Sequence, residues 1–440
     1  MKKILILGAG LSATSLISYL LEISEEHQWE VTVADCVLAT AEKKVGTHKN
    51  GRAIEFNVKD EKQRRDEINR ADLVVSMLPA SMHPVVAKCC VSLKKHMVTA
   101  SYVSDEVKAL DQEAKENGVI LLNEVGVDPG IDHMSTMQVI DKIKAQGGEM
   151  ISFRSYTGGL VAPKYDNNPW NYKFTWNPRN VVLAGQGIAK LIVKGKYKYI
   201  PYNQLFKRTV RANILDVGEF EGYPNRDSLK YRKIYGLDNI PTMLRGTLRR
   251  PGFCKSWDIF VQLGMTDDTY TLEDSENMTY RDFINTYLRY EENMFVENKL
   301  CKYLNISPES YSIYLLRWLG IFSEKRVGLK NATPAQILQQ LLEEKWALDK
   351  DDKDMIVMQH QFGYKLDGEE KLITSSMVFI GKDNENTAMS LTVGLPAAIA
   401  VKLILTGKIT TPGVHIPVTK NIYEPILEEL KGLGIEFIEE

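Results

Sequence analysis

The residues best suited to chemistry in this chain follow short apolar runs. The stretch ASYVS carries Ser101 and Tyr102, and the stretch NEVGVDPGIDH carries Asp128, Asp132 and His133. Carboxylates, phenols and imidazoles commonly transfer protons or orient a reacting group. Each also has a structural alternative, because an aspartate at the start of a helix caps it or stabilises its dipole. The pattern predicts a polar site around Asp128, with Asp132 as a helix-terminal acid. His133 is either a satisfied helix histidine or a ligand or proton-transfer group.

A second group of candidates is basic. The stretch YPNRDS carries Arg226, and the stretch LRGTLRRPGF carries Arg245, Thr247, Arg249 and Arg250. A guanidinium group pairs bidentately with a carboxylate, so a group of arginines favours an anionic ligand. Any one of them is also compatible with a structural ion pair, and Arg250, which precedes a proline, is the one we expect to be solvated.

The N-terminal stretch MKKILILGAGLSA has two interpretations. Its lysines, apolar run and small residues resemble a secretion signal. They also match a strand and a phosphate-binding turn, in which Gly8 permits a sharp turn, Gly10 admits a pyrophosphate and Ala13 lets helix and strand pack closely. The next apolar run, WEVTVAD, ends in Asp35, where such a domain places the acid that binds the adenosine ribose. A secretion signal needs no second strand, so the sequence predicts a dinucleotide-binding domain.

Asp35 also bears on the choice of dinucleotide. A carboxylate at this position repels a 2′-phosphate, and no arginine directly follows it. The expected cofactor is therefore NAD or NADP, with NAD slightly favoured.

Strand and helix patterns alternate through the N-terminal part of the chain. Short apolar runs separated by helical stretches predict a parallel sheet with crossover helices. Ligands of such sheets bind beyond the carboxyl ends of the strands. The informative strand tips are Gly8–Gly10, Asp35, Ser76–Pro79, Thr99–Tyr102 and Val125–Asp128.

The pattern changes near Gly130. We expect an α/β fold with a Rossmann, doubly wound domain at 1–129, an α+β substrate and dimerisation domain at 130–390, and a return segment at 391–440 that packs on the Rossmann domain. A helical insert is expected at about 269–350. The aromatic stretch NPWNYKFTWNPRNVV, punctuated by Pro and Asn, is expected to form functional loops.

Composition argues against several classes of protein. With 55 basic and 57 acidic residues, no general affinity for nucleic acid or membrane surfaces is expected. The five cysteines lack CxxC spacing and predict reduced thiols in the cytoplasm, and the seven scattered histidines predict no metal site. The stretch LTVGLPAAIAVKLILTG is broken by Pro396 and Lys402 and is judged too short to span a bilayer. We therefore expect a soluble protein.

Six stretches, taken in order along the chain, resemble the saccharopine dehydrogenase family. They are SMLPASMHPVVAK, HMVTASYVS, LNEVGVDPGIDHM, SYTGGLVAPKYDNNPWNYKFTWNPRNVV, YPNRDS and LRGTLRRPGF. These stretches cover most of residues 1–254, and a further match covers 385–440, while the helical insert matches only loosely. Together they are far more specific than the glycine turn.

The resemblance implies a Rossmann domain completed by the C-terminal segment, and a substrate domain with a helical insert. It also implies reversible chemistry, in which L-glutamate and α-aminoadipate semialdehyde form an imine that a nicotinamide hydride reduces to saccharopine. Carried over position by position, the residues that hold the substrate are Ser101, Tyr102, Asp128, Arg226, Arg245, Gly246 and Thr247. Besides Gly8, Gly10 and Asp35, those that line the cofactor are Ala9, Leu11, Ser12, Val58, Leu78, Pro79, Val127, Asp128 and Pro129.

Two positions depart from the fungal members of the family. Those relatives tend to have a Cys-Arg pair after the second strand, which suits NADP, whereas this chain has Asp35 and Cys36. The SYTGG stretch has Thr157 where they often have Cys, which argues that no thiol is needed there. The reaction requires a neutral attacking amine and a protonated iminium, so Asp128 and Tyr102 are the hypothesised proton-transfer residues.

Two other functions stay open. A carboxynorspermidine or carboxyspermidine dehydrogenase performs the same reductive coupling on a cationic substrate, so its pocket would contain more acids. The arginines between 226 and 250 favour the tricarboxylate saccharopine instead. A non-catalytic nucleotide-binding regulator would have no need of Tyr102, Asp128 and Arg226. Family behaviour further implies a homodimer that acts on small amino-acid substrates.

Overall fold

The chain forms two compact units in a computed structural model that describes residues 1–184 and 186–440. Unit 1 comprises Met1–Met150, Tyr364–Glu370 and Met377–Glu440. Unit 2 comprises Ile151–Gly363 and Lys371–Ser376. Each unit has its own sheet and its own buried side chains, and each is described by itself below.

Strands and helices alternate through unit 1, as the apolar runs predict. The strands are β1 (Lys2–Leu7), β2 (Trp29–Asp35), β3 (Gly51–Glu55), β4 (Leu73–Ser76), β5 (His96–Val98), β6 (Ile120–Leu122), β15 (Gly413–His415) and β16 (Ile438–Glu439). The helices are η1 (Leu11–Ala13), α1 (Thr14–His27), α2 (Leu38–Val45), α3 (Glu61–Arg70), η2 (Ala80–Met82), α4 (His83–Ser92), α5 (Asp105–Lys108), α6 (Asp111–Glu116), α7 (Ile131–Ala145), α15 (Ala388–Leu405) and α16 (Lys420–Gly432).

The sheet of unit 1 has the strand order β15-β6-β5-β4-β1-β2-β3. Its pairs are parallel. Strands buried on both faces read as continuous apolar runs, and Ile4 to Leu7 of β1 are at most 2% exposed. Without β15, this order is that of a Rossmann domain, whose ligands bind beyond the carboxyl ends of the strands. The predicted fold class is therefore confirmed.

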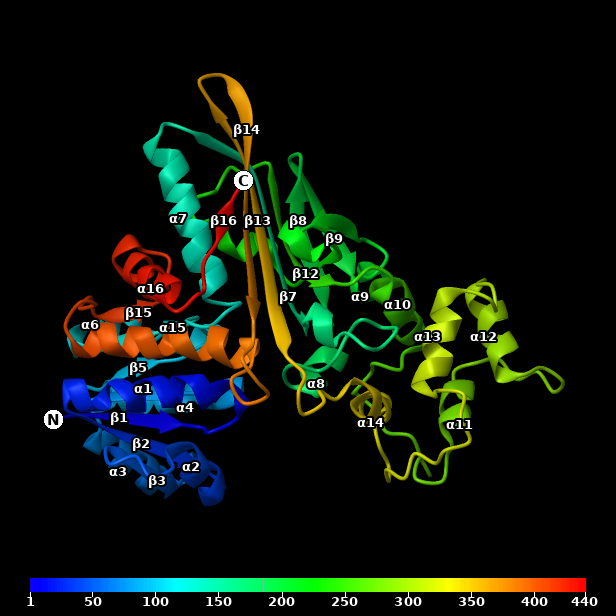
Figure 1. The fold of residues 1–440 in the computed structure, drawn as a ribbon, viewed down its shortest axis with the longest axis horizontal. Coiled ribbons are helices and arrows are strands. Elements are labelled where there is room, and N and C mark those ends of the chain that lie inside the picture. The colour runs from blue at the N-terminus through cyan, green and yellow to red at the C-terminus, as the bar shows by residue number, and fades with distance from the viewer. Residues whose placement is uncertain (185) are drawn as a thin grey trace. The chain divides into compact units, whose positions relative to one another are not determined.

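The C-terminal segment completes this sheet and covers one of its faces. Strand β15 pairs with β6, and α15 packs on α1, β4 and β5. Figure 1 shows α1 (blue) and α15 (orange) running side by side. The close approach of α15 to α1 depends on Gly394, because a Cβ at this residue would lie 2.8 Å from the Leu16 backbone N. The hydroxyl groups of Ser15 and Ser390, 2.8 Å apart, also join the two helices. This confirms the predicted return of the chain onto the Rossmann domain.

Helix α15 is a longer apolar helix than we expected from the sequence. By length and composition Ala388–Leu405 could cross a membrane, so the judgement that this stretch is too short was wrong. Within the structure, however, 78% of the window is buried. Pro396 and the small residues around it face neighbouring elements, which is the environment of a core helix.

Unit 2 is built on a mixed sheet. Its strands are β7 (Glu149–Val161), β8 (Ile188–Val193), β9 (Lys196–Pro201), β10 (Val210–Asn213), β11 (Glu219–Pro224), β12 (Thr242–Arg249), β13 (Asp354–Leu366) and β14 (Glu369–Ile380), of which β7, β13 and β14 also contribute residues to unit 1. The order is β10-β11-β12-β7-β13-β14-β16, with β8 paired to β12 and β9 to β8. Antiparallel pairing of β11 with β12 places the two predicted arginine stretches next to each other.

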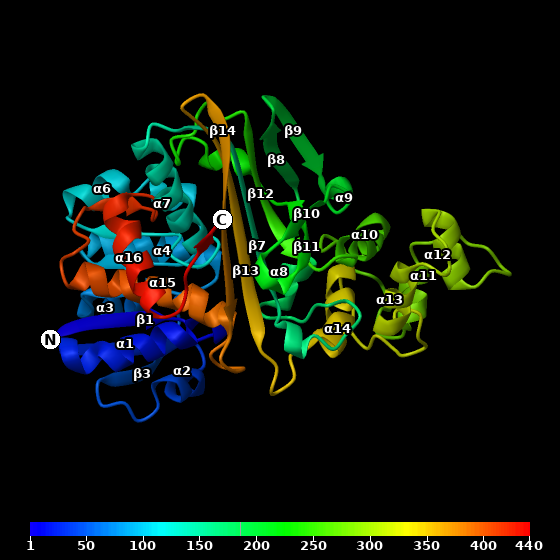
Figure 2. The same cartoon turned by 45° about the horizontal axis from the view of Figure 1, so that its top comes forward.

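Helices of unit 2 lie between these strands and beyond them. They are η3 (Pro163–Tyr165), α8 (Pro178–Val182), α9 (Tyr202–Leu205), η4 (Leu215–Val217), η5 (Ser228–Tyr231), α10 (Phe253–Leu263), α11 (Tyr280–Asn285), α12 (Val296–Leu304), α13 (Tyr311–Leu319) and α14 (Pro334–Trp346). Figure 2 shows α11, α12 and α13 grouped together, and α14 beside α8. These four helices, α11 to α14, form the predicted helical insert.

The aromatic stretch before α8 contributes to the core of unit 2. Trp170 and Tyr172 are 1% and 0% exposed, and both pack against Trp346 of α14 at ring-centroid distances of 5.2 and 5.0 Å. The backbone here is irregular, as predicted, but these rings are interior side chains rather than exposed loop residues. Trp176, which is 38% exposed, is the exception.

Candidate active site

The glycine turn after β1 has the shape that a bound pyrophosphate requires. Gly8 has φ +99°, and a Cβ at this residue would lie 2.9 Å from the Met77 carbonyl oxygen. At Gly10 a Cβ would have no atom within 4 Å, so the backbone there faces open space. Element η1 follows at once and runs directly into α1, and the first N–H groups of η1 have no helical partner. The turn therefore fits a nicotinamide dinucleotide, as predicted from Gly8 and Gly10.

Asp35 joins the end of β2 to this turn. Its Oδ2 accepts a hydrogen bond from the Ala9 N–H at 2.8 Å, and its Oδ1 accepts one from the Val37 N–H at 3.0 Å. The side chain is half-buried, and the next three residues, Cys36 to Leu38, are exposed and uncharged. The carboxylate thus lies at the end of β2 with no basic residue directly after it, and its contact with a ribose stays a prediction.

The other predicted cofactor residues follow strands of the same parallel sheet. Leu11 and Ser12 belong to η1, Val58 follows β3, Leu78 and Pro79 follow β4, and Val127 to Pro129 follow β6. Leu11 is 71% exposed, while Val58 is 7% exposed. Since parallel strands end at one edge, the sheet brings these segments to the same side of unit 1. Their contact with a cofactor stays a prediction.

Tyr102 and Asp128 meet beyond β5 and β6. The Tyr102 hydroxyl donates a hydrogen bond to Asp128 Oδ1 at 3.2 Å, and both side chains are half-buried. Asp128 does not cap α7, whose N-cap is Gly130. Asp132 accepts a hydrogen bond from the Gly130 N–H at 2.6 Å and acts as the acid of the helix N-terminus.

His133 lies in the interior of unit 1, on the first turn of α7. It is 0% exposed, and its Nε2 lies 2.8 Å from Oε2 of Glu124, which is also 0% exposed. Oε1 of Glu124 accepts a hydrogen bond from the Val103 N–H at 3.0 Å. Glu124 was not singled out in the sequence, yet it links the segment after β5 to the first turn of α7. This burial favours the structural alternative for His133.

His83 is a second histidine that the sequence did not single out. Its Nδ1 lies 2.8 Å from Ser76 Oγ at the end of β4, and its Nε2 lies 2.8 Å from Ser101 Oγ beyond β5. The imidazole is 4% exposed, and burial lowers the pKa of His83 to about 4. A neutral imidazole therefore connects two strand tips through a predicted substrate residue.

The predicted residues of unit 2 form one cross-strand group. Asn225 follows β11, and its backbone N–H donates to the Arg245 carbonyl at 3.0 Å. The Asn225 side chain donates to Thr247 Oγ1, also at 3.0 Å. The Arg245 guanidinium stacks on the Tyr231 ring at 4.6 Å from its centroid. Because β11 pairs with β12, Asn225 lies beside Arg245 and Thr247, and the three residues form one polar group.

Arg226 and Gly246 belong to the same region. Arg226 is exposed and has φ +53°, and its carbonyl accepts a hydrogen bond from the Lys190 N–H at 2.9 Å. At Gly246 a Cβ would lie 2.6 Å from the Tyr223 carbonyl oxygen, so a side chain would push β11 and β12 apart. The requirement for glycine here is structural, whereas the Arg226 side chain reaches solvent.

The two remaining arginines of the LRGTLRRPGF stretch have structural surroundings. Arg249 is 4% exposed, and its guanidinium lies 4.9 Å from the Tyr172 ring centroid and 5.3 Å from that of Phe253. Arg250 lies 4.2 Å from the Phe220 ring centroid and donates to the Val217 carbonyl at 2.9 Å. Arg250 is therefore half-buried rather than fully solvated as expected, because its guanidinium packs on Phe220 and binds a backbone carbonyl.

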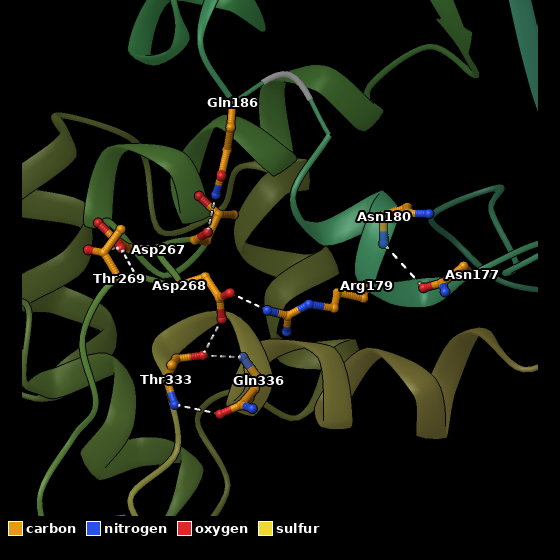
Figure 3. Close-up of polar contacts among 10 residues, drawn as sticks. Asn177, Arg179, Asn180, Gln186, Asp267, Asp268, Thr269, Thr333 and Gln336 are labelled. Carbon is orange, nitrogen blue, oxygen red and sulfur yellow. Dashed lines mark hydrogen bonds and ion pairs between the residues drawn. The ribbon is translucent and has the colours of Figure 1, made fainter. Parts of the chain in front are cut away.

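A polar network fixes the segment that leads into α8. Figure 3 shows Arg179 reaching Asp268, which also accepts a hydrogen bond from Thr333 Oγ1 at 2.7 Å. Thr333 is the N-cap of α14 and shares a capping box with Gln336. On the other side, Asn177 caps α8 by accepting from the Asn180 N–H. The network therefore ties α8, the segment after α10 and α14 together.

Comparison with known proteins covers nearly the whole chain. Residues 4–122 match the family model of the saccharopine dehydrogenase NADP binding domain, and residues 126–435 match that of the saccharopine dehydrogenase C-terminal domain. The saccharopine dehydrogenase (NADP(+), L-glutamate-forming) of Schizosaccharomyces pombe is 32% identical in an alignment that covers 100% of this chain and 99% of that protein.

A longer relative and a solved structure agree with this match. The mitochondrial alpha-aminoadipic semialdehyde synthase of Rattus norvegicus is 34% identical over 99% of this chain, which spans only 47% of that protein, or about half its length. The apo saccharopine dehydrogenase (L-Glu forming) of Saccharomyces cerevisiae has a TM-score of 0.91 and 31% identity, and the alignment covers 100% of this chain and 99% of that one. The chain belongs to the saccharopine dehydrogenase family.

Proposed function

We propose that this protein is an NAD(P)-dependent oxidoreductase that interconverts saccharopine with L-glutamate and α-aminoadipate semialdehyde. The observation that carries the proposal is the Tyr102–Asp128 hydrogen bond at the carboxyl edge of a Rossmann sheet. It is supported by a fungal relative that is named for this activity and aligns with this chain over 99% of its own length. A hydroxyl and a carboxylate in contact can orient an amine and move a proton.

The reaction in the oxidative direction balances simply. A hydride leaves the carbon next to the secondary amine of saccharopine, water adds to that carbon, and the carbon–nitrogen bond breaks. The products are glutamate, the semialdehyde, the reduced cofactor and one proton. Bound nicotinamide dinucleotide supplies the hydride acceptor, and the glycine turn with Asp35 would hold it through the pyrophosphate and the ribose.

The residues of the chain have the remaining tasks. Asp128 accepts and returns the proton of the reacting nitrogen, and Tyr102 keeps the carboxylate oriented through their hydrogen bond. Ser101 donates to the substrate from the tip of β5. Arg226 and Arg245 bind substrate carboxylates, assisted by Thr247, because guanidinium groups form charged hydrogen bonds with carboxylates.

The finer cofactor choice is part of the proposal. The related family model describes an NADP binding domain, and the fungal relative is named for NADP(+). The Asp-Cys-Val-Leu sequence from Asp35 onward offers a negative charge and no cation to a 2′-phosphate. We therefore keep the expectation that NAD is slightly favoured over NADP in this chain.

Further properties remain proposals. The five cysteines are free thiols, which supports a cytoplasmic location, although the rat relative is named mitochondrial. A homodimer that binds only small amino-acid substrates, without nucleic acid or membrane, is proposed from the family resemblance. The functional division is likewise a proposal. Residues 1–129 would bind the cofactor, residues 130–390 would bind the substrate, and residues 391–440 would return to pack on the Rossmann domain.

The polyamine alternative is not favoured, because the relatives above are named for saccharopine rather than for a polyamine. A direct assay separates the possibilities. Purified protein is mixed with saccharopine and either NAD⁺ or NADP⁺, and absorbance of the reduced nicotinamide is followed. Reduction of either cofactor supports the proposal. Oxidation of reduced cofactor only with a diamine and aspartate semialdehyde would favour the polyamine reaction, and no reaction with any pair would favour a nucleotide-binding regulator.

A further inference from the structure

The surroundings of Ser76, His83 and Ser101 determine which group donates in each hydrogen bond between them. His83 is the first residue of α4 and bridges the tips of β4 and β5 through contacts of 2.8 Å on each ring nitrogen. Ser76 is 0% exposed and His83 is 4% exposed, so water cannot complete their hydrogen bonding. Among residues 1–184 and 186–440 the ring nitrogens of His83 contact two hydroxyls and no carboxylate, so the buried imidazole stays neutral.

A neutral imidazole donates from one nitrogen and accepts at the other, so two arrangements are conceivable. Across residues 1–184 and 186–440, the hydroxyl of Ser76 has one hydrogen-bonding contact, which is His83 Nδ1. If Nδ1 carried the proton, the Ser76 hydroxyl hydrogen would be buried without an acceptor, at a cost of about 1–3 kcal/mol. Ser76 therefore donates to Nδ1, and the proton of the ring resides on Nε2.

This tautomer determines what Ser101 offers to a ligand. The Nε2–H of His83 donates to Ser101 Oγ, so that hydroxyl is left with its own hydrogen to donate. In the described part of the chain, Ser101 Oγ has no other hydrogen-bonding contact, and the residue is half-buried at the strand tip. Ser101 is thus polarised as a donor toward an acceptor outside the trio.

We infer that His83 is a positioning residue that holds the Ser101 hydroxyl as a hydrogen-bond donor to a carboxylate oxygen of the amino-acid substrate. The inference rests on the proposed function, because it takes Ser101 as a substrate ligand. It deepens that function, because a carboxylate can accept the Ser101 hydrogen, whereas an ammonium group would find only the second lone pair of an oxygen that already accepts from His83. The His83–Ser101 pair then contributes to the choice of a carboxylate-bearing substrate over a cationic one.

The first test measures the tautomer without substrate. The ¹⁵N chemical shifts of the imidazoles are recorded at neutral pH on the full chain, and the His83 signals are assigned by their loss in His83→Asn. A protonated Nε2 with an unprotonated Nδ1 supports the inference. A protonated Nδ1, or two protonated nitrogens, overturns it.

The second test replaces His83 with Gln or with Asn, whose amide groups each mimic one of the two ring nitrogens. Gln at position 83 places its amide where Nε2 lies and can still donate to Ser101, whereas Asn reaches only toward Ser76. We expect His83→Asn and Ser101→Ala each to raise the KM for saccharopine roughly tenfold, with kcat changed far less. His83→Gln restores most of the loss, and Ser92→Ala on the exposed end of α4 is the matched serine control.

A double variant separates positioning from general packing. Because His83 acts through Ser101, the His83→Asn/Ser101→Ala protein should have a KM no higher than the worse single variant. Additive increases, or a His83→Gln protein as impaired as His83→Asn, would overturn the inference. If the wild-type protein fails to oxidise saccharopine at all, the proposed function is contradicted, while the tautomer still decides the His83 arrangement independently.

Discussion

The hydroxyl of Tyr102 donates a hydrogen bond to Oδ1 of Asp128 across 3.2 Å and so joins the tips of β5 and β6. Neither residue caps a neighbouring helix, since the N-cap of α7 is Gly130 and that of α5 is Ser104. The Tyr102–Asp128 contact is the one to which the proposed function assigns proton transfer. It lies at the edge of the sheet where Rossmann domains bind their ligands.

Replacing Asp128 with Asn should reduce kcat for saccharopine oxidation by about 10²–10⁴-fold, because an amide cannot accept the proton of the reacting nitrogen. Tyr102→Phe should have a smaller effect, since it removes only the group that orients the carboxylate. Steady-state kinetics and the thermal midpoint of each variant distinguish lost chemistry from lost folding. Unchanged turnover in Asp128→Asn would show that its assigned role is wrong.

Asp35→Asn tests the cofactor argument. The amide oxygen can still accept from the Ala9 N–H, but the negative charge is removed. Repulsion of the 2′-phosphate should fall, so the ratio of NADP⁺ to NAD⁺ affinity should rise by about tenfold, which is ~1.4 kcal/mol. Dissociation constants from fluorescence titration without substrate provide the measurement. An unchanged ratio would show that the Asp35 charge does not govern cofactor choice.

Arg245→Gln should raise the KM for saccharopine by roughly 10–100-fold, because a charged hydrogen bond to a carboxylate contributes about 1.5–3 kcal/mol. Arg250→Gln is the matched control on the same stretch, since that guanidinium lies on Phe220 and binds the Val217 carbonyl. The control should leave the KM within about threefold of wild type. Equal effects of the two substitutions would argue against a substrate contact at Arg245.

The polar network of Figure 3 predicts an order of stability effects. Arg179 and Asp268 are 41% and 24% exposed, so Arg179→Ala should cost ~0–1 kcal/mol of unfolding free energy. Thr333→Ala removes the N-cap of α14 together with its bond to Asp268 and should cost more, ~1 kcal/mol or above. Urea denaturation followed by tryptophan fluorescence measures both. The reverse order would mean that the ion pair, rather than the cap, holds this region.

His83 predicts a specific dependence of stability on pH. The folded pKa is about 4 and the ordinary value is 6.5, so between these pH values the unfolded chain binds more protons at this site. The free energy of unfolding contributed by this site therefore rises with pH, by on the order of 3 kcal/mol across the window. It is fully present above pH 6.5 and is lost as the pH falls toward 4.

The matched comparison for this effect is His83→Asn, whose side chain does not titrate. Chemical denaturation of both proteins at pH 4.5 and pH 7 gives the pH-dependent part of each stability. Wild type should lose more stability on acidification than the variant does. Equal losses would show that His83 is not the group responsible.

Local sequence signals were sufficient to predict the turn after β1 and the end of β2, while the cofactor contacts assigned to them stay a prediction. Gly8 and Gly10 stand in a fixed order after an apolar strand, and Asp35 ends the next strand. Asp132 was recognisable as a helix-terminal acid because its place depends only on the start of α7. Signals of this kind involve neighbours along the chain, so they can be recognised without knowledge of tertiary contacts.

Other features depend on contacts between distant segments and had no local signal. Nothing in SMHPV indicates that His83 bridges two strand tips, because Ser101 approaches only once β4 and β5 pair. The burial of Trp170 likewise depends on Trp346, far along the chain. The aromatic stretch was therefore interpreted as functional loops, and Arg250 as a solvated residue, whereas Trp170 packs against Trp346 and Arg250 against Phe220.

The measurement that tests the central claim most directly is the identity of the products of saccharopine oxidation. Purified protein is incubated with saccharopine and NAD⁺ or NADP⁺, and the amino acids formed are quantified against the reduced cofactor. The account predicts one glutamate for each reduced nicotinamide, with the semialdehyde as the other product. Formation of lysine and 2-oxoglutarate instead, or no reduction of either cofactor, would contradict it.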